Sequence, residues 1–228
     1  LASMYFMQIV WGLRKEPFIG VRPLNHAKEA PTTGAWQFTN AIDSWSWQGY
    51  EGEKAVVEVY ANSASVRLLL NGKEIANKPV KKYKTLFKLP YQPGTLTAEA
   101  LDERGNVISS HSLTTAGEET VLRVTPDKMV LCANNQALCY LPIEFTDKAG
   151  NLKPYIEQRV EVAVAGAATL AGFGSALCKT NEVFDKPYHH SYRGRCLAVL
   201  RAGSTPGKAK VTVTSAGMEP VTIEVEVQ

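Results

Sequence analysis

The chain lacks any long apolar run and any strong excess of charge of one sign. None of its apolar stretches reaches the ~18 residues that a membrane-spanning helix needs. Its 25 Lys and Arg against 22 Asp and Glu leave a net charge of +3, which is too small to indicate a nucleic-acid-binding protein. The densest basic run, with Lys78, Lys81, Lys82, Lys84 and Lys88, is typical of the solvated face of a hairpin.

The N-terminus lacks the signals of an exported precursor. It has no basic region followed by an apolar core and a small-residue cleavage site, and position 1 is Leu rather than Met. We therefore expect a fragment of a longer protein. No Asn-x-Ser/Thr acceptor occurs in the chain, so N-glycosylation gives no support to secretion by a eukaryote. The localisation stays open, and we favour a periplasmic or secreted bacterial protein.

Cysteine is scarce and confined to the second half of the chain, at Cys132, Cys139, Cys178 and Cys196. A domain of this size does not need disulfides, so we interpret the cysteines as free, buried, small hydrophobic residues. If any pair is joined, we expect Cys132 and Cys139, because the intervening Asn134-Asn135 could turn the chain back and bring their Cα atoms within bridging distance.

The usual sequence signatures of catalysis, metal binding and nucleotide binding are also absent. No Gly-x-Ser-x-Gly motif occurs, and Gly172-Phe-Gly174 lacks the third glycine of a dinucleotide fingerprint. His189 and His190 are adjacent, so on a strand they point to opposite faces and cannot easily share one ion. We therefore expect neither a metal nor a cofactor.

What the sequence does contain is a series of short strands with a period of two. The 228 residues are 45% hydrophobic, enough for the cores of one or two domains. No helix-period segment separates the strands, which excludes a parallel α/β sheet. We predict strands from about residue 53 to 60 and over 65–70, 83–89, 95–102 and 106–114, and a second series over 120–124, 138–146, 159–165, 168–173, 195–202, 208–215 and 221–227.

Before these strands we predict a short helix and an irregular connector. Residues 3–11 carry apolar side chains and stop at Gly12, which indicates a helix. Residues 13–44 hold Pro17, Pro23 and Pro31 without a clear period. Between the strands, Asn71-Gly72 predicts a tight type I′ hairpin, and residues 175–191 form the longest expected loop. The fold class is therefore all-β, with two tandem immunoglobulin-like antiparallel β-sandwiches preceded by a short helix and an irregular connector.

One aromatic, glycine and acidic cluster carries a family resemblance. Trp45-Ser-Trp47-Gln-Gly49-Tyr-Glu51-Gly52 is similar to the segment that follows the catalytic barrel in glycoside hydrolase family 2, the β-galactosidase and β-glucuronidase group. The resemblance continues, in the same order and spacing, through the hairpin around Pro93-Gly94 and the junction between modules at Thr115-Ala-Gly117. It then extends to a terminal immunoglobulin-like module, through the segments Gly172-Phe-Gly174, Tyr192-Arg-Gly194, Pro206-Gly207 and Ser215-Ala-Gly217. Residues 22–43 depart from it, since a shorter connection is expected there.

The resemblance implies three parts. Residues 1–44 are the end of the last barrel helix and its connector, residues 45–117 a first sandwich, and residues 118–228 a second, immunoglobulin-like sandwich. We expect Tyr5, Phe6, Ile9, Val10 and Trp11 to form an apolar surface that faces the barrel of the same longer chain or packs on the first sandwich.

The chemistry implied for the parent is the retaining hydrolysis of terminal β-glycosides, most simply as a β-galactosidase. Retaining glycosidases use two carboxylic groups, and in this family both glutamates lie on the preceding barrel. No residue here matches their motifs, so we assign no catalytic residue. Glu51 stands beside two Trp, but we expect it to accept hydrogen bonds from turn amides.

Aromatic residues are the remaining candidates for contact with sugar, because a flat ring with a polar edge packs on a pyranose. Trp36, Trp45, Trp47 and Tyr50 cluster near the start of the first sandwich. We favour the interpretation that Trp45 and Trp47 seal the module, which leaves Trp36 as the better candidate for binding.

Three functions remain open from the sequence. The leading one is a non-catalytic C-terminal region of a family 2 glycosidase that braces the barrel, rims its cleft and takes part in a homo-oligomer. The second is an independent pair of carbohydrate-binding modules, and the third a cell-surface spacer of immunoglobulin-like repeats. Fold cannot separate them, since sandwiches host many functions.

Overall fold

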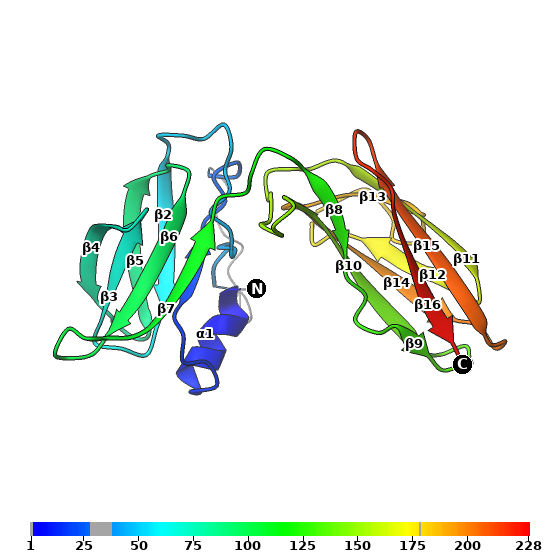
Figure 1. Cartoon of the computed structure of the whole chain (residues 1–228), viewed down its shortest axis with the longest axis horizontal. Helices are drawn as coiled ribbons and strands as arrows, with labels where there is room; N and C mark the ends of the chain where they lie inside the picture. Colours follow the sequence, from blue (N-terminus) through cyan, green and yellow to red (C-terminus); the bar gives the residue numbers. More distant parts are fainter. Residues whose placement is uncertain (1, 28–37, 178) are drawn as a thin grey trace. The chain divides into compact units, whose positions relative to one another are not determined.

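The computed structural model describes residues 2–27, 38–177 and 179–228. The chain forms two compact units, Leu1–Thr115 and Ala116–Gln228 (Figure 1). Each unit consists of two β-sheets, and α1 (Ala2–Val10) precedes the strands of the first. The predicted all-β class and the predicted short helix are confirmed. Within the described ranges, no helix is long and apolar enough to cross a membrane.

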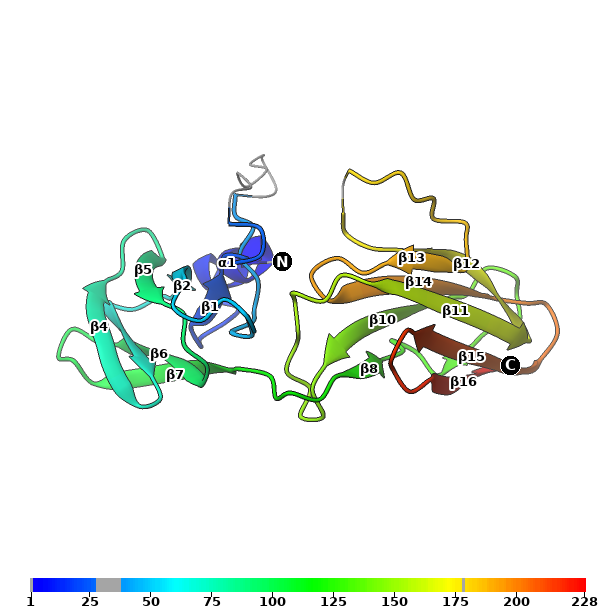
Figure 2. The same ribbon diagram turned by 90° about the horizontal axis from the view of Figure 1, so that it is seen from above.

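The first unit packs a three-stranded sheet against a four-stranded sheet (Figures 1 and 2). Every strand pair in both sheets is antiparallel. One sheet has the order β1 (Phe18–Val21), β2 (Lys54–Tyr60), β5 (Lys84–Pro90), and the other the order β4 (Lys73–Pro79), β3 (Ser65–Leu70), β6 (Thr95–Leu101), β7 (Val107–Thr114).

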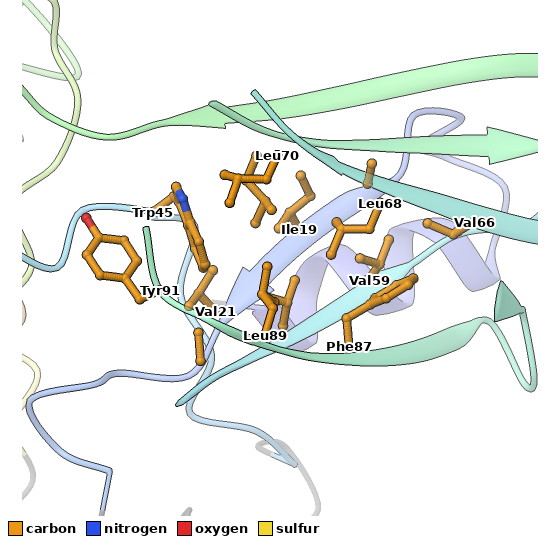
Figure 3. Packing of buried hydrophobic residues seen from close by; sticks show 14 of the residues in the cluster. Ile19, Val21, Trp45, Val59, Val66, Leu68, Leu70, Phe87, Leu89 and Tyr91 are labelled. Atoms are coloured by element: carbon orange, nitrogen blue, oxygen red, sulfur yellow. The ribbon is translucent and has the colours of Figure 1, made fainter. Parts of the chain in front are cut away.

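The core of the first unit follows from the alternation of apolar residues along these strands. Figure 3 shows Val66, Leu68 and Leu70 of β3 directed toward Phe87 and Leu89 of β5. All five are buried, while the intervening residues are partly or fully exposed. The period of two in the sequence therefore places one face of each strand in the core.

The second unit is a larger sandwich with the same layering (Figure 2). Its strands pair antiparallel, except that β16 and β9 are parallel. One sheet has the order β12 (Ala168–Gly174), β14 (Arg195–Ala202), β10 (Leu138–Thr146), β8 (Val121–Val124), and the other the order β13 (Tyr188–His190), β11 (Arg159–Gly166), β15 (Gly207–Ser215), β16 (Val221–Val227), β9 (Val130–Leu131).

Four strands lie where the sequence predicted none. Strand β1 lies inside the predicted connector and pairs with β2, from Phe18 opposite Tyr60 to Val21 opposite Val57. It is short and bracketed by Pro17 and Pro23, so it has no readable period. Strand β4 lies at a sheet edge and is mostly exposed, so it carries no apolar alternation. Strands β9 and β13 have only two and three residues.

The cysteines for which the structure describes a side chain are all free. Cys139 and Cys196 are buried, as predicted, whereas Cys132 is exposed. Burial raises the pKa of the Cys196 thiol to about 12, so this side chain stays neutral and packs as an apolar group in the core of the second unit. Cys178 lies outside the described residues.

The two-residue turn at Asn71-Gly72 is present as predicted. It joins Leu70 of β3 to its partner Lys73 of β4, with φ of +52° at Asn71 and +77° at Gly72. Both values lie in the left-handed region, as a type I′ turn requires. A Cβ atom added at Gly72 would meet nothing within 4 Å, so only the backbone conformation restricts this position.

We expect Gly72→Val to lower the free energy of unfolding by roughly 1–2 kcal/mol, because a β-branched residue is strained at positive φ. Gly72→Asn is the control, since Asn tolerates this conformation and the space around Gly72 is open. Urea unfolding of the three proteins measures the difference. Equal stability of the Val and Asn variants would contradict the backbone argument.

Candidate functional site

The two tryptophans singled out from the sequence, Trp45 and Trp47, are both completely buried. The Trp45 ring packs edge-on against Tyr91 and its Nε1–H donates to the Gln92 carbonyl at 3.0 Å (Figure 3). The Trp47 amide donates to the Tyr91 hydroxyl at 3.1 Å. Both rings belong to the core of the first unit, so in this structure they offer no surface to a sugar.

The other residues of the predicted cluster have different surroundings. Tyr50 is partly buried and packs against the same core, while Trp36 lies outside the described residues. The Glu51 carboxylate accepts the Gly49 amide at 3.1 and 3.2 Å, so it caps the turn as the sequence suggested. The structure therefore does not bring the four aromatic candidates together as one described surface.

The His189-His190 pair, which the sequence analysis considered as a metal site, instead contacts the carboxylate of Glu182. His189 is buried and His190 exposed, so the two side chains leave opposite faces of β13. Glu182, from the preceding loop, lies 2.8 Å from Nδ1 of His190 and 3.3 Å from Nδ1 of His189. Burial would raise the pKa of Glu182, but the hydrogen bonds from His190 lower it. Within the described residues, no group of three His, Cys, Asp or Glu side chains could hold a metal ion.

Glu58 of β2 is a fully buried charged residue in the first unit. The sequence analysis did not single it out. Its side chain is fully buried, and Oε1 accepts Nε of Arg22 at 2.8 Å and Oγ1 of Thr39 at 3.0 Å. Oε2 accepts Nζ of Lys84 at 2.6 Å and the hydroxyl of Tyr60 at 2.7 Å. One carboxylate thus joins four segments that are far apart in the sequence.

Glu58 is held in its charged form by these donors. Burial alone would raise the pKa of its carboxyl, but the hydrogen bonds from Lys84, Tyr60 and Arg22, together with the charge of Lys84, lower it overall. Burial and the neighbouring negative charge raise the pKa of Tyr60, so its hydroxyl remains a donor. The cluster is a satisfied ionic network, and nothing in it resembles a pair of catalytic carboxylates.

Next to Glu58, aromatic rings fasten the helix α1 to the first unit. Tyr5 stacks on Phe18 with 4.3 Å between ring centroids, and Phe6 meets Tyr60 edge-on at 5.3 Å. Ile9 is buried against the same group. The inner face of α1 therefore covers the outer face of the β1-β2-β5 sheet, as Figure 2 shows for α1 beside β1 and β2.

The opposite face of α1 leaves large apolar side chains in solvent. The exposed fractions are 50% for Met4, 38% for Met7 and 67% for Trp11, and Leu13 just beyond the helix is 73% exposed. We refer to Met4, Met7, Trp11 and Leu13 as the outer face of α1. Of the two expected arrangements, Tyr5, Phe6 and Ile9 adopt the second and pack on the first unit, whereas Trp11 does not and stays exposed.

Comparisons with known proteins agree with this architecture. Residues 122–224 match the family model described as "Glycoside hydrolase family 2 C-terminal domain 5". Residues 52–109 match a second model, described only as a domain of unknown function. The two matches fall within the second and first unit respectively.

Individual relatives extend the match over almost the whole chain. The chain is 29% identical over 195 residues to the β-galactosidase BoGH2A of Bacteroides ovatus, covering 84% of this chain and 23% of that protein. The chain is thus similar to the C-terminal portion of larger glycoside hydrolase family 2 enzymes. A solved family 2 member from Bacteroides cellulosilyticus superimposes with a TM-score of 0.85 and 26% identity, over 98% of this chain and 30% of that one.

A more distant structure supports the fold alone. A β-glycosidase from Bacteroides vulgatus superimposes with a TM-score of 0.78 and 21% identity, over 99% of this chain and 26% of that one. The chain thus spans a quarter to a third of these relatives. The assignment to a non-catalytic segment of family 2, made from the order of turns and aromatic motifs, is supported by these matches.

We expect Glu58→Gln to lower the free energy of unfolding at pH 7 by about 3 kcal/mol, the low end of the range for removing one partner of a buried ion pair. The low end applies because Arg22 and Lys84 are 40% and 27% exposed and can turn to water. Glu224→Gln is the control. It removes an exposed pair in which the side chains of Glu224 and Lys208 are 57% and 73% exposed, and the loss of such a pair has a much smaller effect.

The same substitution has a defined pH dependence. Since the folded-state pKa of Glu58 is lowered, its contribution is complete above the unfolded-state pKa of about 4.3 and is lost as the pH falls below that value. Urea unfolding at pH 7 and at pH 3 should therefore show the wild type and Glu58→Gln converging in acid. A gap that stays constant with pH would rule out the charged form as the source of stability.

Proposed function

We propose that this chain is the non-catalytic C-terminal region of a retaining β-glycosidase and that its first unit braces the catalytic barrel of the same longer protein. The outer face of α1 carries this proposal. Met4 and Met7 on the helix, and Trp11 and Leu13 just beyond its end, are exposed large apolar side chains, while the other face of the helix is fixed to the sandwich. An apolar surface of this kind usually marks an interface.

The length of the relatives supports the barrel as the occupant of that surface. The matched relatives are three to four times longer than this chain, so a large part of each lies outside the aligned region. A helix fixed to one domain by its inner face and exposing apolar residues on its outer face is suited to join that domain to another. The aromatic cluster holds α1 against β1 and β2, and Glu58 accepts the hydroxyl of Tyr60 within that cluster.

We further propose that the parent enzyme hydrolyses terminal β-linked sugars with retention, as a β-galactosidase. The relative with 29% identity bears that name. Its organism and that of the 26%-identical structure, both Bacteroides, support a bacterial source. By the family resemblance, the two carboxylic groups that such a reaction needs would belong to the barrel. The role of this chain would then be to support the barrel. Any homo-oligomer would be an assembly of the complete enzyme.

The 228-residue chain alone should not release nitrophenol from aryl β-galactosides or β-glucuronides, whereas the full-length enzyme should hydrolyse the β-galactoside. Absorbance assays on both proteins test this directly. Turnover by the isolated chain that persists through repeated purification and in a Glu51→Gln variant would overturn the assignment of a non-catalytic role.

Trp11→Ala distinguishes a bracing surface from an ordinary exposed residue. In the full-length enzyme it should cost about 3–5 kcal/mol, the range for Trp removed from a packed core. In the isolated chain, where Trp11 is in solvent, the change should stay within about 0.5 kcal/mol.

Met129→Ala provides the matched control, since Met129 is 53% exposed in the second unit and lies outside the proposed surface. Thermal and urea unfolding of both variants, in both proteins, give the comparison. If Trp11→Ala has the same small effect in the full-length enzyme as in the isolated chain, α1 does not contact the barrel.

A further inference from the structure

The positive charge of the chain is concentrated in one short segment of the first unit. Residues 73–88 contain six lysines and one glutamate, a net charge of +5. Since the whole chain carries +3, the remaining residues together carry −2. This segment consists of β4, β5 and the turn between them. The two strands are edge strands of different sheets that contact each other, so the charge gathers where these two sheet edges meet.

A cavity of about 530 Å³ opens at this turn, within the range of ~300–1,000 Å³ for small-molecule sites. Its apolar wall comes from Phe6 of α1, Phe38 and Leu86. Its rim carries Lys81 and Lys82, together with Lys84, and none of the described residues that line it is acidic. The cavity therefore combines aromatic surface with uncompensated positive charge.

The rim lysines differ in their partners. Lys84 is neutralised by Glu58 at 2.6 Å, and this contact fixes one side of the rim. Within the described ranges 2–27, 38–177 and 179–228, no acidic side chain lies within ion-pair distance of Lys81 or Lys82. These two ammonium groups are available to an external anion.

Protection of sheet edges explains only part of this charge. Lysines on edge strands discourage pairing with other chains, and β4 and β5 are edge strands, which accounts for Lys73, Lys78 and Lys88. Lys81 and Lys82 lie beyond both strands, in the turn. That turn is closed by mutual backbone hydrogen bonds between Lys81 and Lys84, at 3.1 Å each.

The turn also holds residues that its conformation disfavours. Lys82 and Tyr83 have φ of +49° and +63°, values for which Gly and Asn are preferred because they avoid a steric penalty. Strain of this kind at a surface turn is a reason to look for a function. Here it presents Lys82 at the rim of the cavity.

We propose that this cavity, the lysine pocket formed by Phe6, Phe38, Leu86, Lys81, Lys82 and Lys84, binds an acidic saccharide. Uronate carboxylates pair with Lys81 and Lys82, and the apolar face of a sugar ring packs on Phe6 and Phe38. This inference rests on the proposed function for its choice of a sugar, because a glycosidase works on glycans.

Other polyanions fit the observations less well. A nucleic-acid-binding domain typically has a pI above ~9, whereas the sequence pI is 8.6. An acidic protein partner would need about 800 Å² of surface on each side, whereas the unpaired charge here is confined to two lysines at the rim of one concave site. A carboxylated sugar matches both the size of the cavity and its mixture of apolar wall and charge.

Binding of a galacturonic acid trisaccharide to the 228-residue chain, measured by calorimetry, tests the proposal. The double substitution Lys81→Gln with Lys82→Gln should weaken binding about tenfold or more, the effect of losing charge-assisted hydrogen bonds. The control, Lys73→Gln with Lys88→Gln, removes the same charge from the same segment outside the cavity and should change the affinity less than about twofold. Phe38→Ala should also weaken binding, and unaltered melting temperatures would show that the variants are folded.

Four results would overturn the proposal. These are no binding of the acidic trisaccharide, equal binding of a neutral galactose trisaccharide, equal losses in both double variants, or binding to anionic phospholipid vesicles without binding to the sugar. The same titration on the full-length enzyme must show the same dependence on Lys81 and Lys82, or the site is covered there. Because the readout is binding, a failure here leaves the hydrolysis and stability tests of the proposed function unaffected.

Discussion

The buried carboxylate of Glu58 is the interaction on which the first unit depends. It collects donors from the segment after β1, from the stretch before Trp45, from its own strand and from the start of β5. A buried charge is tolerated only when such donors surround it. The four donors come from positions 22, 39, 60 and 84. The network is therefore complete only when the sheet β1-β2-β5 has formed and the segment around Thr39 lies against it.

The cluster also determines what α1 can do. Glu58 and Tyr60 leave the outer face of β2, on the side away from the sandwich core, and Tyr60 provides the ring against which Phe6 packs. The helix is therefore held by aromatic contacts to a ring, Tyr60, that is itself hydrogen-bonded to Glu58. The rotation of the helix about its axis decides which of its side chains remain exposed. Met4, Met7 and Trp11 are outward because Phe6 and Ile9 are inward.

Sequence reasoning recovered the parts of the fold that local chemistry specifies. The alternation in Val221–Val227 and Leu138–Thr146 gave strand bounds that match the structure, and the turn at Asn71-Gly72 followed from its demand for positive φ. It failed for β1, whose strand character depends on pairing with β2, 36 or more residues later, and for β4, whose edge position removes the apolar signal. The single Glu near the centre of β2 gave no sign that Tyr60 and three donors distant in sequence would meet it.

The candidate site was recovered only in part, for a related reason. The tryptophans were recognised as the start of a module, and the structure places Trp45 and Trp47 in its core. The exposed face of α1 was anticipated as an apolar surface, but its residues depend on the rotation of the helix, which only the contacts with Phe18 and Tyr60 define. Composition indicated the lysine run but not the cavity beside it, because Phe6 and Phe38 are more than 40 residues away in sequence from Lys81 and Lys82.

The double covering of β2 has a consequence for motion. Its inner face lies in the sandwich core and its outer face lies under α1 and the aromatic cluster, so five of its seven residues are buried. Such a strand has no low-energy opening that exposes its amides without separating a sheet from its partner or a helix from the sheet. Amide protons of β2 should therefore exchange with solvent only through unfolding of the entire first unit, whereas those of the edge strand β4 should exchange through local fraying. The exchange rate of the β2 amides would therefore show whether a change at α1 alters the stability of the whole first unit.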